Sequence, residues 1–302
     1  MLNTPEGYRS GFVALVGRPN VGKSTLLNKL VGQKVAIMSD KPQTTRHKIH
    51  SVLSRNDAQI VFLDTPGIHK PRHKLGEYMV DVALGALKEV DVVLFLVEAT
   101  GLPGSGDRYI AEQLQGIQTP VFLMINKIDL VKKEAVLGLI NSYKDLLPFA
   151  EVIPVSALAG ENVDRLIDTI IRYLPEGPRY YPADMVTDRP ERFIMAEIIR
   201  EKVLQLTSEE VPHSVAVVVE QIQERNNGVV AVNAVIYTER DSQKAILIGK
   251  GGSMLKEVGR RAREEIENLL GSKVYLELWV KVKKDWRNKM ADLRNFGFME
   301  EE

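Results

Sequence analysis

The sequence predicts an α/β domain with a mostly parallel sheet, followed by a smaller α+β domain. Three observations support this prediction. A glycine-rich stretch, Gly17–Ser24, lies between an apolar run and a segment with helical spacing. Apolar runs and helical segments then alternate up to Tyr173, as in folds built from strand-helix-strand units. Four prolines between residues 175 and 190 stop helices and central strands, and a different element order follows them.

Composition excludes several classes of function. Apolar residues make up 44% of the 302 residues, enough for the cores of two domains. The net charge is zero, so any nucleic-acid site has to be local. The absence of cysteine excludes disulfides, thiol catalysis and zinc–thiolate sites. The longest apolar run, Val92–Val97, is far shorter than a membrane span, and the first residues lack a signal-peptide pattern.

The stretch Gly17–Ser24 reads G-x-x-x-x-G-K-S, the spacing of a phosphate-binding loop. It follows a strand predicted over 12–16 and precedes a helix predicted over 25–31, which Gly32 ends. The glycines let backbone N–H groups point at phosphate oxygens, and the start of the helix adds the positive end of its dipole. A plain glycine turn is the alternative, but it would not require every fixed position of the motif.

The side chains of this loop have distinct chemical roles in that interpretation. Lys23 supplies a positive charge to the outer phosphates, and Ser24 offers a hydroxyl to Mg²⁺. We therefore predict a nucleotide site that includes Gly17, Arg18, Pro19, Asn20, Val21, Gly22, Lys23, Ser24 and Thr25.

A second motif follows the next pair of predicted strands, over residues 47–54 and 58–63. The later strand ends in Asp64-Thr65-Pro66-Gly67, a D-x-x-G element. An aspartate at the carboxyl end of a strand beside the phosphate loop suits a magnesium site, and Gly67 lets the backbone approach the terminal phosphate. A surface turn is the alternative, since all four residues favour turns.

The remaining elements of the first domain lead to a third motif. Helices are predicted over residues 75–88, 107–114, 133–146 and 163–173, and strands over 91–97, 121–125 and 151–155. The strand over 121–125 ends in Asn126-Lys127-Ile128-Asp129, an N-K-x-D element. The carboxylate of Asp129 can accept two hydrogen bonds from N1–H and the 2-amino group of guanine, whereas adenine offers neither donor. Asn126 and Lys127 would brace the loop, and a backbone N–H at Ser156-Ala157 could reach the guanine carbonyl.

After the prolines the sequence predicts the element order α-β-β-α-α-β. Helices are expected over residues 191–206, 242–248 and 253–270, and strands over 214–223, 229–237 and 273–282. The second and third helices are joined by Gly249-Lys250-Gly251-Gly252, a G-x-x-G loop. This order with this loop is typical of a KH domain, whose glycine loop contacts the backbone of about four nucleotides.

Basic residues gather beside this loop. Residues 244–263 contain six basic side chains and one acid, Glu257. Such patches supply phosphate contacts, whereas a helix-to-helix turn with a solvated charged face is the alternative. We predict RNA contacts at Ile248, Gly249, Lys250, Gly251, Gly252, Lys256, Arg260 and Arg263.

Taken together, these residues resemble the Era family of GTPases over nearly the whole chain. The marks of the resemblance are Gly17–Ser24, Gln43–Arg46, Asp64–Gly67, Asn126–Asp129, Ser156-Ala157, Glu210–His213 and Gly249–Gly252. The implied fold is a P-loop GTPase domain with a mostly parallel sheet at residues 1–176, a linker at 177–190, and a C-terminal α+β KH type II domain at 191–302.

The resemblance also implies function. It implies a GTP hydrolase that binds GTP and GDP with Mg²⁺, binds small-subunit ribosomal RNA near its 3′ end, and assists assembly of the small ribosomal subunit. It further implies that the nucleotide state controls access of RNA and that the protein associates loosely with the inner membrane. Apart from the resemblance, we expect a monomer in the cytoplasm.

The family pattern assigns roles to single residues and leaves one open. Thr44 and Thr45 are both candidates for the magnesium threonine; Thr45 is preferred because it directly precedes Arg46, as in sister families. The implied metal ligands are then Ser24, Thr45 and Asp64, and the implied catalytic residues are Lys23, Thr45 and Gly67.

One position departs from Ras-like proteins. Ile68 replaces the glutamine that positions the attacking water, and an isoleucine cannot do so by hydrogen bonding. Some related GTPases use K⁺ held partly by the asparagine that matches Asn20, so K⁺ is a second candidate ion.

Three other classes of function compete with this interpretation. An RNA-binding module with a structural nucleotide site would show no GTP turnover with magnesium. A tRNA-modification GTPase fits less well because of the Gly249–Gly252 loop and the lack of a C-terminal cysteine. A P-loop kinase is disfavoured because Asn126–Asp129 specifies guanine and no acceptor site is evident.

Overall fold

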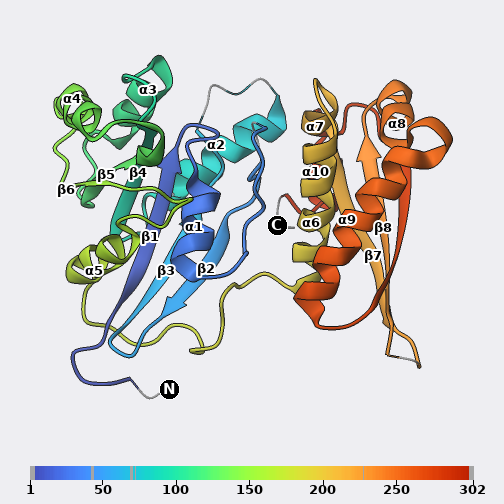
Figure 1. Ribbon diagram of the computed structural model, residues 1–302, viewed down its shortest axis with the longest axis horizontal. Helices are drawn as coiled ribbons and strands as arrows, with labels where there is room; N and C mark the ends of the chain where they lie inside the picture. The colour runs from blue at the N-terminus through green and yellow to red at the C-terminus, as the bar shows by residue number, and fades with distance from the viewer. Residues whose placement is uncertain (1–3, 42–43, 69–70, 72, 227, 299–302) are drawn as a thin grey trace. The chain divides into compact units, whose positions relative to one another are not determined.

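The computed structural model describes residues 4–41, 44–68, 71, 73–226 and 228–298 (Figure 1). Its described residues divide into two units. The first lies within Met1–Ala36, Thr45–Pro71 and Gly76–Asp188, and the second within Ile37–Thr44, Arg72–Leu75 and Arg189–Glu302. Gln43 of the Gln43–Arg46 element and Asn227 of the turn expected before the strand over 229–237 lie outside the described residues.

The first unit is built on a six-stranded sheet of order β2-β3-β1-β4-β5-β6. The strands are β1 (Arg9–Gly17), β2 (Ile49–Ser54), β3 (Ala58–Asp64), β4 (Val92–Glu98), β5 (Val121–Asn126) and β6 (Glu151–Pro154). Neighbouring strands are parallel except for β2 and β3, which are antiparallel. The predicted mostly parallel sheet is therefore confirmed, with the carboxyl ends of its parallel strands along one edge.

Helices cover both faces of this sheet. They are α1 (Lys23–Val31), α2 (Lys74–Ala86), α3 (Ser105–Leu114), α4 (Lys133–Tyr143) and α5 (Val163–Tyr173). Successive side chains of β1 point to opposite faces. Val13 and Leu15 therefore join the core under α1 and α5, whereas Ala14 and Val16 join the core under α2, α3 and α4. The apolar runs of the sequence are continuous because these strands are buried on both sides.

Residues 177–188 belong to the first unit. The side-chain oxygen of Gln59 accepts the N–H groups of Tyr180 and Tyr181 at 2.8 and 3.0 Å. The N–H of Val52 donates to the carbonyl of Val186 at 2.9 Å, so this segment pairs with the free edge of β2. Much of the stretch that the sequence predicts as a linker thus covers a sheet edge that would otherwise expose unpaired backbone groups.

The second unit has the predicted order with two added short helices. Its elements are α6 (Glu191–Leu206), α7 (Val211–Ser214), β7 (Ala216–Glu224), β8 (Val230–Thr238), α8 (Asp241–Ile248), α9 (Ser253–Leu270), β9 (Val274–Val282) and α10 (Met290–Asn295). The sheet order is β7-β8-β9, with β7 antiparallel and β9 parallel to β8. One core forms where α6, α8 and α9 pack on alternate residues of β8, such as Val232 and Ile236.

The C-terminal segment of this unit adds a core that the sequence pattern did not predict. Trp286 is fully buried, and its indole N–H donates to the carbonyl of Ser214 at 2.9 Å. Its ring contacts Phe296 edge-on at 5.3 Å and stacks on Phe298 at 5.8 Å. Short apolar segments without periodicity gave no signal for this packing. Within the part of the chain that the structure describes, no helix is both long and apolar enough to cross a bilayer.

Candidate nucleotide and RNA sites

The phosphate loop between β1 and α1 requires glycine at position 22. Gly22 has a φ of +99°, in the left-handed region that favours glycine. A Cβ atom there would lie 2.2 Å from the side-chain nitrogen of Asn126. The loop backbone therefore lies directly against the N-K-x-D element, so two of the predicted motifs are neighbours.

Lys23 lies at the centre of this loop. Its ammonium donates to the backbone carbonyls of Gly17 and Arg18 at 3.1 and 3.0 Å. Burial lowers the pKa of Lys23 to about 8, although the charge of Asp64 acts in the opposite direction. A phosphate beside this ammonium would favour its charged form and raise the pKa again.

The three predicted metal ligands lie together. The hydroxyls of Ser24 and Thr45 are 3.0 Å apart, and each lies 3.2 Å from Oδ2 of Asp64. Asp64 is fully buried, and its Oδ1 has no hydrogen-bond partner among the described residues. Burial raises the pKa of Asp64 to about 6. Two hydroxyls and a carboxylate with an unsatisfied oxygen fit Mg²⁺, which prefers oxygen ligands.

The two candidate threonines differ in their surroundings. Thr45 is 9% exposed and belongs to the cluster with Ser24 and Asp64. The hydroxyl of Thr44 instead donates to the carbonyl of Lys41 at 2.6 Å. The geometry therefore favours Thr45 as the metal-binding threonine.

The D-x-x-G element lies against the phosphate loop. A Cβ atom on Gly67 would be 2.9 Å from the backbone nitrogen of Pro19, so a larger residue would push the two segments apart. Ile68 is 1% exposed and packs in the core under α2, α3 and α4. No water-positioning group is therefore present at residue 68.

The N-K-x-D element braces the phosphate loop through side chains. Asn126 donates to the carbonyl of Val21 at 2.8 Å and accepts the N–H of Ala157 at 3.0 Å. Lys127 donates to the carbonyl of Asn20 at 2.9 Å and to Glu98 at 2.7 Å. The bracing that the sequence predicts for Asn126 and Lys127 is present in this geometry.

The side of the site that we predict to read the base contains Asp129 and Ser156. The hydroxyl of Ser156 donates to Oδ1 of Asp129 at 2.5 Å, so this pair orients an exposed carboxylate. The backbone N–H of Ser156 donates to the carbonyl of Glu161. Since the N–H of Ala157 is bonded to Asn126, both N–H groups expected near the guanine carbonyl have protein acceptors in this structure.

The glycine loop of the second unit lies where the sequence predicts it, between α8 and α9. Gly249, Gly251 and Gly252 all have positive φ angles, of +73°, +61° and +81°. A Cβ atom on Gly249 would lie 2.8 Å from the backbone nitrogen of Met254, whereas Gly251 faces open space. Lys250 is exposed at this loop, and Ile248 packs against the core. The exposed backbone leaves room for a sugar-phosphate chain.

The basic residues of α9 are less available than the sequence suggests. Arg260 pairs with Glu257 and Glu264, each at 2.8 Å, and Arg263 lies 3.5 Å from Glu267. The two arginines 260 and 261 lower the pKa of Glu257 to about 2. Lys256 is exposed on the same helix. The available positive charge near the loop is therefore carried more by Lys250 and Lys256 than by Arg260.

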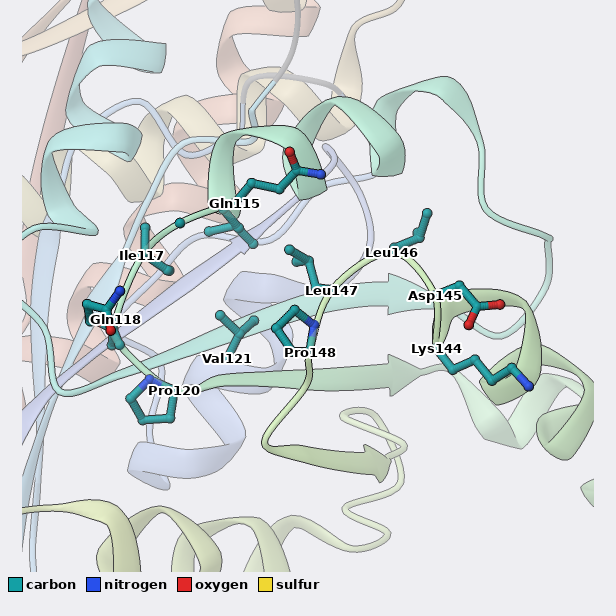
Figure 2. A pocket seen from close by; sticks show the side chains of 13 residues that line it. Gln115, Ile117, Gln118, Pro120, Val121, Lys144, Asp145, Leu146, Leu147 and Pro148 are labelled. Carbon is teal, nitrogen blue, oxygen red and sulfur yellow. The ribbon is translucent and has the colours of Figure 1, made fainter.

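A separate pocket of about 510 Å³ lies elsewhere in the first unit (Figure 2). Its lining comes from residues 114–121, which lead into β5, and from residues 144–148, which follow α4. It is therefore at the amino end of β5, whereas Asn126 is at the carboxyl end. None of the residues predicted to bind nucleotide lines this pocket, and we assign it no function.

Comparison with known proteins gives family matches for both units. Residues 12–127 match the family described as 50S ribosome-binding GTPase, and residues 210–287 match the KH domain. The GTPase Era of Staphylococcus haemolyticus (strain JCSC1435) is 58% identical over 295 residues, which cover 98% of this chain and 99% of the relative.

Two solved structures are similar over nearly the whole chain. One is Era in complex with MgGDPNP and nucleotides 1506–1542 of 16S ribosomal RNA. The other is a variant of Aquifex aeolicus Era bound to GDP and AlF₄⁻. Each has a TM-score of 0.94 and 46% sequence identity, and each comparison covers 97% of this chain and 100% of the other.

Replacing Lys23 should remove most of the GTP hydrolysis. The variant Lys23→Ala deletes the ammonium that donates to the backbone carbonyls of residues 17 and 18. Loss of one preorganised donor to a developing anion costs roughly 100-fold in rate or more. Phosphate release under saturating GTP measures this, with a thermal melt to show that both units remain folded. Wild-type turnover would exclude the loop as the active site.

Asp129 should determine the choice of base. In Asp129→Asn, one acceptor for the guanine donors is lost, while the new amide N–H can donate to the C2 carbonyl of xanthine. We expect GTP affinity to fall roughly tenfold to a hundredfold, and xanthosine triphosphate to bind better than GTP. Competition binding with both nucleotides tests this, and Asp145→Asn, in the pocket of Figure 2, is the matched control. An unchanged preference for GTP would contradict the assignment.

Proposed function

The chain belongs to the Era family of GTPases, and we propose that it is a GTP-controlled RNA-binding switch in assembly of the small ribosomal subunit. The chain is a GTP hydrolase with a C-terminal KH domain. The observation that carries the proposal is the combination of the Ser24–Thr45–Asp64 cluster in the first unit with the Gly249–Gly252 loop in the second. The structure of Era with MgGDPNP and the 16S RNA fragment supports extending both ligands to this chain.

We assign the nucleotide site to the loop, the metal cluster and the base-reading residues. Lys23 would contact the outer phosphates, and Ser24, Thr45 and Asp64 would hold Mg²⁺. A bound Mg²⁺ supplies positive charge to the transferring phosphoryl group. The protein residues would position this group, since phosphoryl transfer depends mostly on positioning and electrostatic stabilisation.

Potassium is the second proposed ion. The side chain of Ile68 is buried and has no hydrogen-bonding atom, so it cannot orient the attacking water. Asn20 adopts the left-handed conformation in the phosphate loop, with a φ of +67°. Its carbonyl is held by Lys127 at 2.9 Å. This fixed position supports Asn20 as a ligand for a monovalent cation beside the phosphates.

The RNA site is proposed at the glycine loop and the start of α9. Gly249–Gly252 would allow close approach of the RNA backbone, with Lys250 in the loop, Ile248 just before it and Lys256 in the first turn of α9. Arg260 and Arg263 would have to exchange their glutamate partners for phosphates, which makes them secondary contacts. We further propose residues 1–176 as the nucleotide-binding domain and 191–302 as the RNA-binding domain.

Family membership supports a proposal for the cellular setting. We propose a monomeric cytoplasmic protein that associates peripherally with the inner membrane. Fractionation of cells into cytosol, membranes and ribosomal particles would test the location. A complete absence from the membrane fraction would contradict the proposed membrane association.

Hydrolysis should depend on the monovalent cation. We expect several-fold faster turnover in KCl than in NaCl at the same ionic strength, because an ion near Asn20 would replace the missing polar group at residue 68. Asn20→Ala should remove the difference between the two salts. Equal rates of the wild-type protein in both salts would contradict a potassium site.

The RNA site should be separable from the nucleotide site. Lys250→Asp together with Gly251→Asp places two anions where RNA phosphates would pass, and both positions are exposed. We expect strong loss of binding to the 3′ end of small-subunit ribosomal RNA, with GTP affinity and basal turnover near wild type. Binding of the wild-type protein should also weaken with salt, with log affinity falling by roughly 0.7 per phosphate contact for each tenfold increase in salt.

Filter binding beside a GTPase assay on the same protein samples measures both sites. Normal RNA binding by the double variant would refute the KH assignment. Simultaneous loss of GTP binding would instead refute the independence of the two sites. A charge-matched control is Lys144→Asp, which lies at the pocket of Figure 2 in the first unit.

A further inference from the structure

Arg18 belongs to the phosphate loop, but its side chain contacts the first turn of α3. Its Nε donates to Oδ1 of Asp107 at 2.7 Å. Arg18 is 36% exposed in its side chain, whereas Asp107 is fully buried. The neighbouring Gly106 lies so close to the arginine stem that a Cβ atom there would be 2.6 Å from Cδ of Arg18. The start of α3 is therefore shaped around this side chain.

Asp107 is fixed in place by α3 itself. Its Oδ2 accepts the backbone N–H of Gly104, the N-cap residue, at 2.9 Å. As the third residue of the helix, it also interacts favourably with the positive end of the helix dipole. Burial and the charge of Asp107 raise the pKa of the Tyr143 hydroxyl from α4, which keeps this neighbour neutral. Asp107 is thus a rigid and preformed partner for Arg18.

The backbone of Arg18 in turn contacts the central charge of the nucleotide site. Its carbonyl accepts the ammonium of Lys23 at 3.0 Å. Arg18 therefore makes both contacts itself: its side chain binds Asp107, and its backbone carbonyl accepts Lys23. A shift of residue 18 away from α3 would move a carbonyl that holds Lys23.

Further contacts hold the loop; among them are two from the N-K-x-D element and the N–H of Ile68, which donates to the carbonyl of Gly17 at 3.3 Å. Asn126 donates to the carbonyl of Val21, and Lys127 donates to the carbonyl of Asn20. The contact with Asp107 holds the loop from α3, which carries none of the nucleotide motifs. We infer that Asp107 is a positioning residue for GTP binding, which holds Arg18 so that the phosphate loop has its binding shape before the nucleotide arrives.

This inference rests on the proposed nucleotide site and makes a specific kinetic claim. A loop that is shaped beforehand needs less ordering when the ligand binds. The backbone N–H groups of the loop would contact phosphates in the ground state and in the transition state alike, so losing its support should raise KM and Kd more than it lowers kcat. A purely structural role would lower the melting temperature without changing the affinity of the folded protein.

The first test compares three variants of this pair. Arg18→Met keeps an apolar stem beside Gly106 and removes the guanidinium, and Arg18→Lys restores a positive charge. We expect Arg18→Met to raise the Kd for both GTP and GDP, and the KM, about tenfold, as for loss of one hydrogen bond to a charged group, and to lower kcat by a smaller factor. Arg18→Lys should recover most of the affinity. Arg18→Met with Asp107→Asn should bind no worse than Arg18→Met alone, because both changes remove the same contact.

A matched control separates positioning from stability. Arg55 and Asp168 form an ion pair of the same length, 2.7 Å, in the same unit and away from the proposed site. Arg55→Met should leave Kd and KM unchanged. Wild-type affinity in folded Arg18→Met, or an equal loss in Arg55→Met, would overturn the inference. If Arg18→Met does not fold, the double variant with Asp107→Asn is used instead, because it leaves no unpaired carboxylate at residue 107. Its affinity for GTP then tests the same contact.

Lys23→Ala, assayed in parallel, distinguishes this inference from the site on which it rests. Loss of turnover in Lys23→Ala with normal affinity in Arg18→Met would refute the positioning role of Asp107 alone. Wild-type turnover in Lys23→Ala would refute the proposed site itself.

Discussion

The side-chain amide of Asn126 is the contact on which the nucleotide site depends most. It is 2% exposed and spans two loops, with Val21 on one side and Ala157 on the other. A buried amide must have its hydrogen bonds satisfied, so these two loops are held at a fixed separation. Gly22 lies so close to the same amide that a side chain at residue 22 would clash with it. The segments predicted to bind the phosphates and to read the base are therefore held together at the carboxyl edge of the sheet.

The sequence predicted this assembly because its parts are local motifs, each at the end of a strand that an apolar run indicates. Parallel strands end at one edge of the sheet, so motifs that follow β1, β3 and β5 had to come together. The contact of Arg18 with Asp107 could not be predicted in the same way, because it depends on where α3 starts in space. Trp286 was missed for a related reason: its burial depends on a short C-terminal segment that has no periodic pattern.

Charged residues of α6 show a second limit of sequence patterns. Glu201 and Lys202 are buried, although charged residues in a helix usually face solvent. Lys202 pairs with Glu201 at 2.6 Å and with Glu265 of α9. Glu201 also accepts the N–H of Met38 at 2.7 Å, and the described part of residues 37–44 belongs to the second unit. A segment that comes early in the sequence thus belongs to the second unit, which no local pattern could indicate.

The electrostatics around Asp64 and Lys23 explain why bound ligands should favour the charged forms of both groups. Burial raises the pKa of Asp64 to about 6 and lowers that of Lys23 to about 8, so burial acts against the charged form of both groups. A cation at Asp64 and a phosphate at Lys23 would each reverse this effect by supplying the opposite charge. A magnesium–nucleotide complex supplies both at once. Since anything that binds the folded form stabilises it, this complex should stabilise the first unit as well as fill its site.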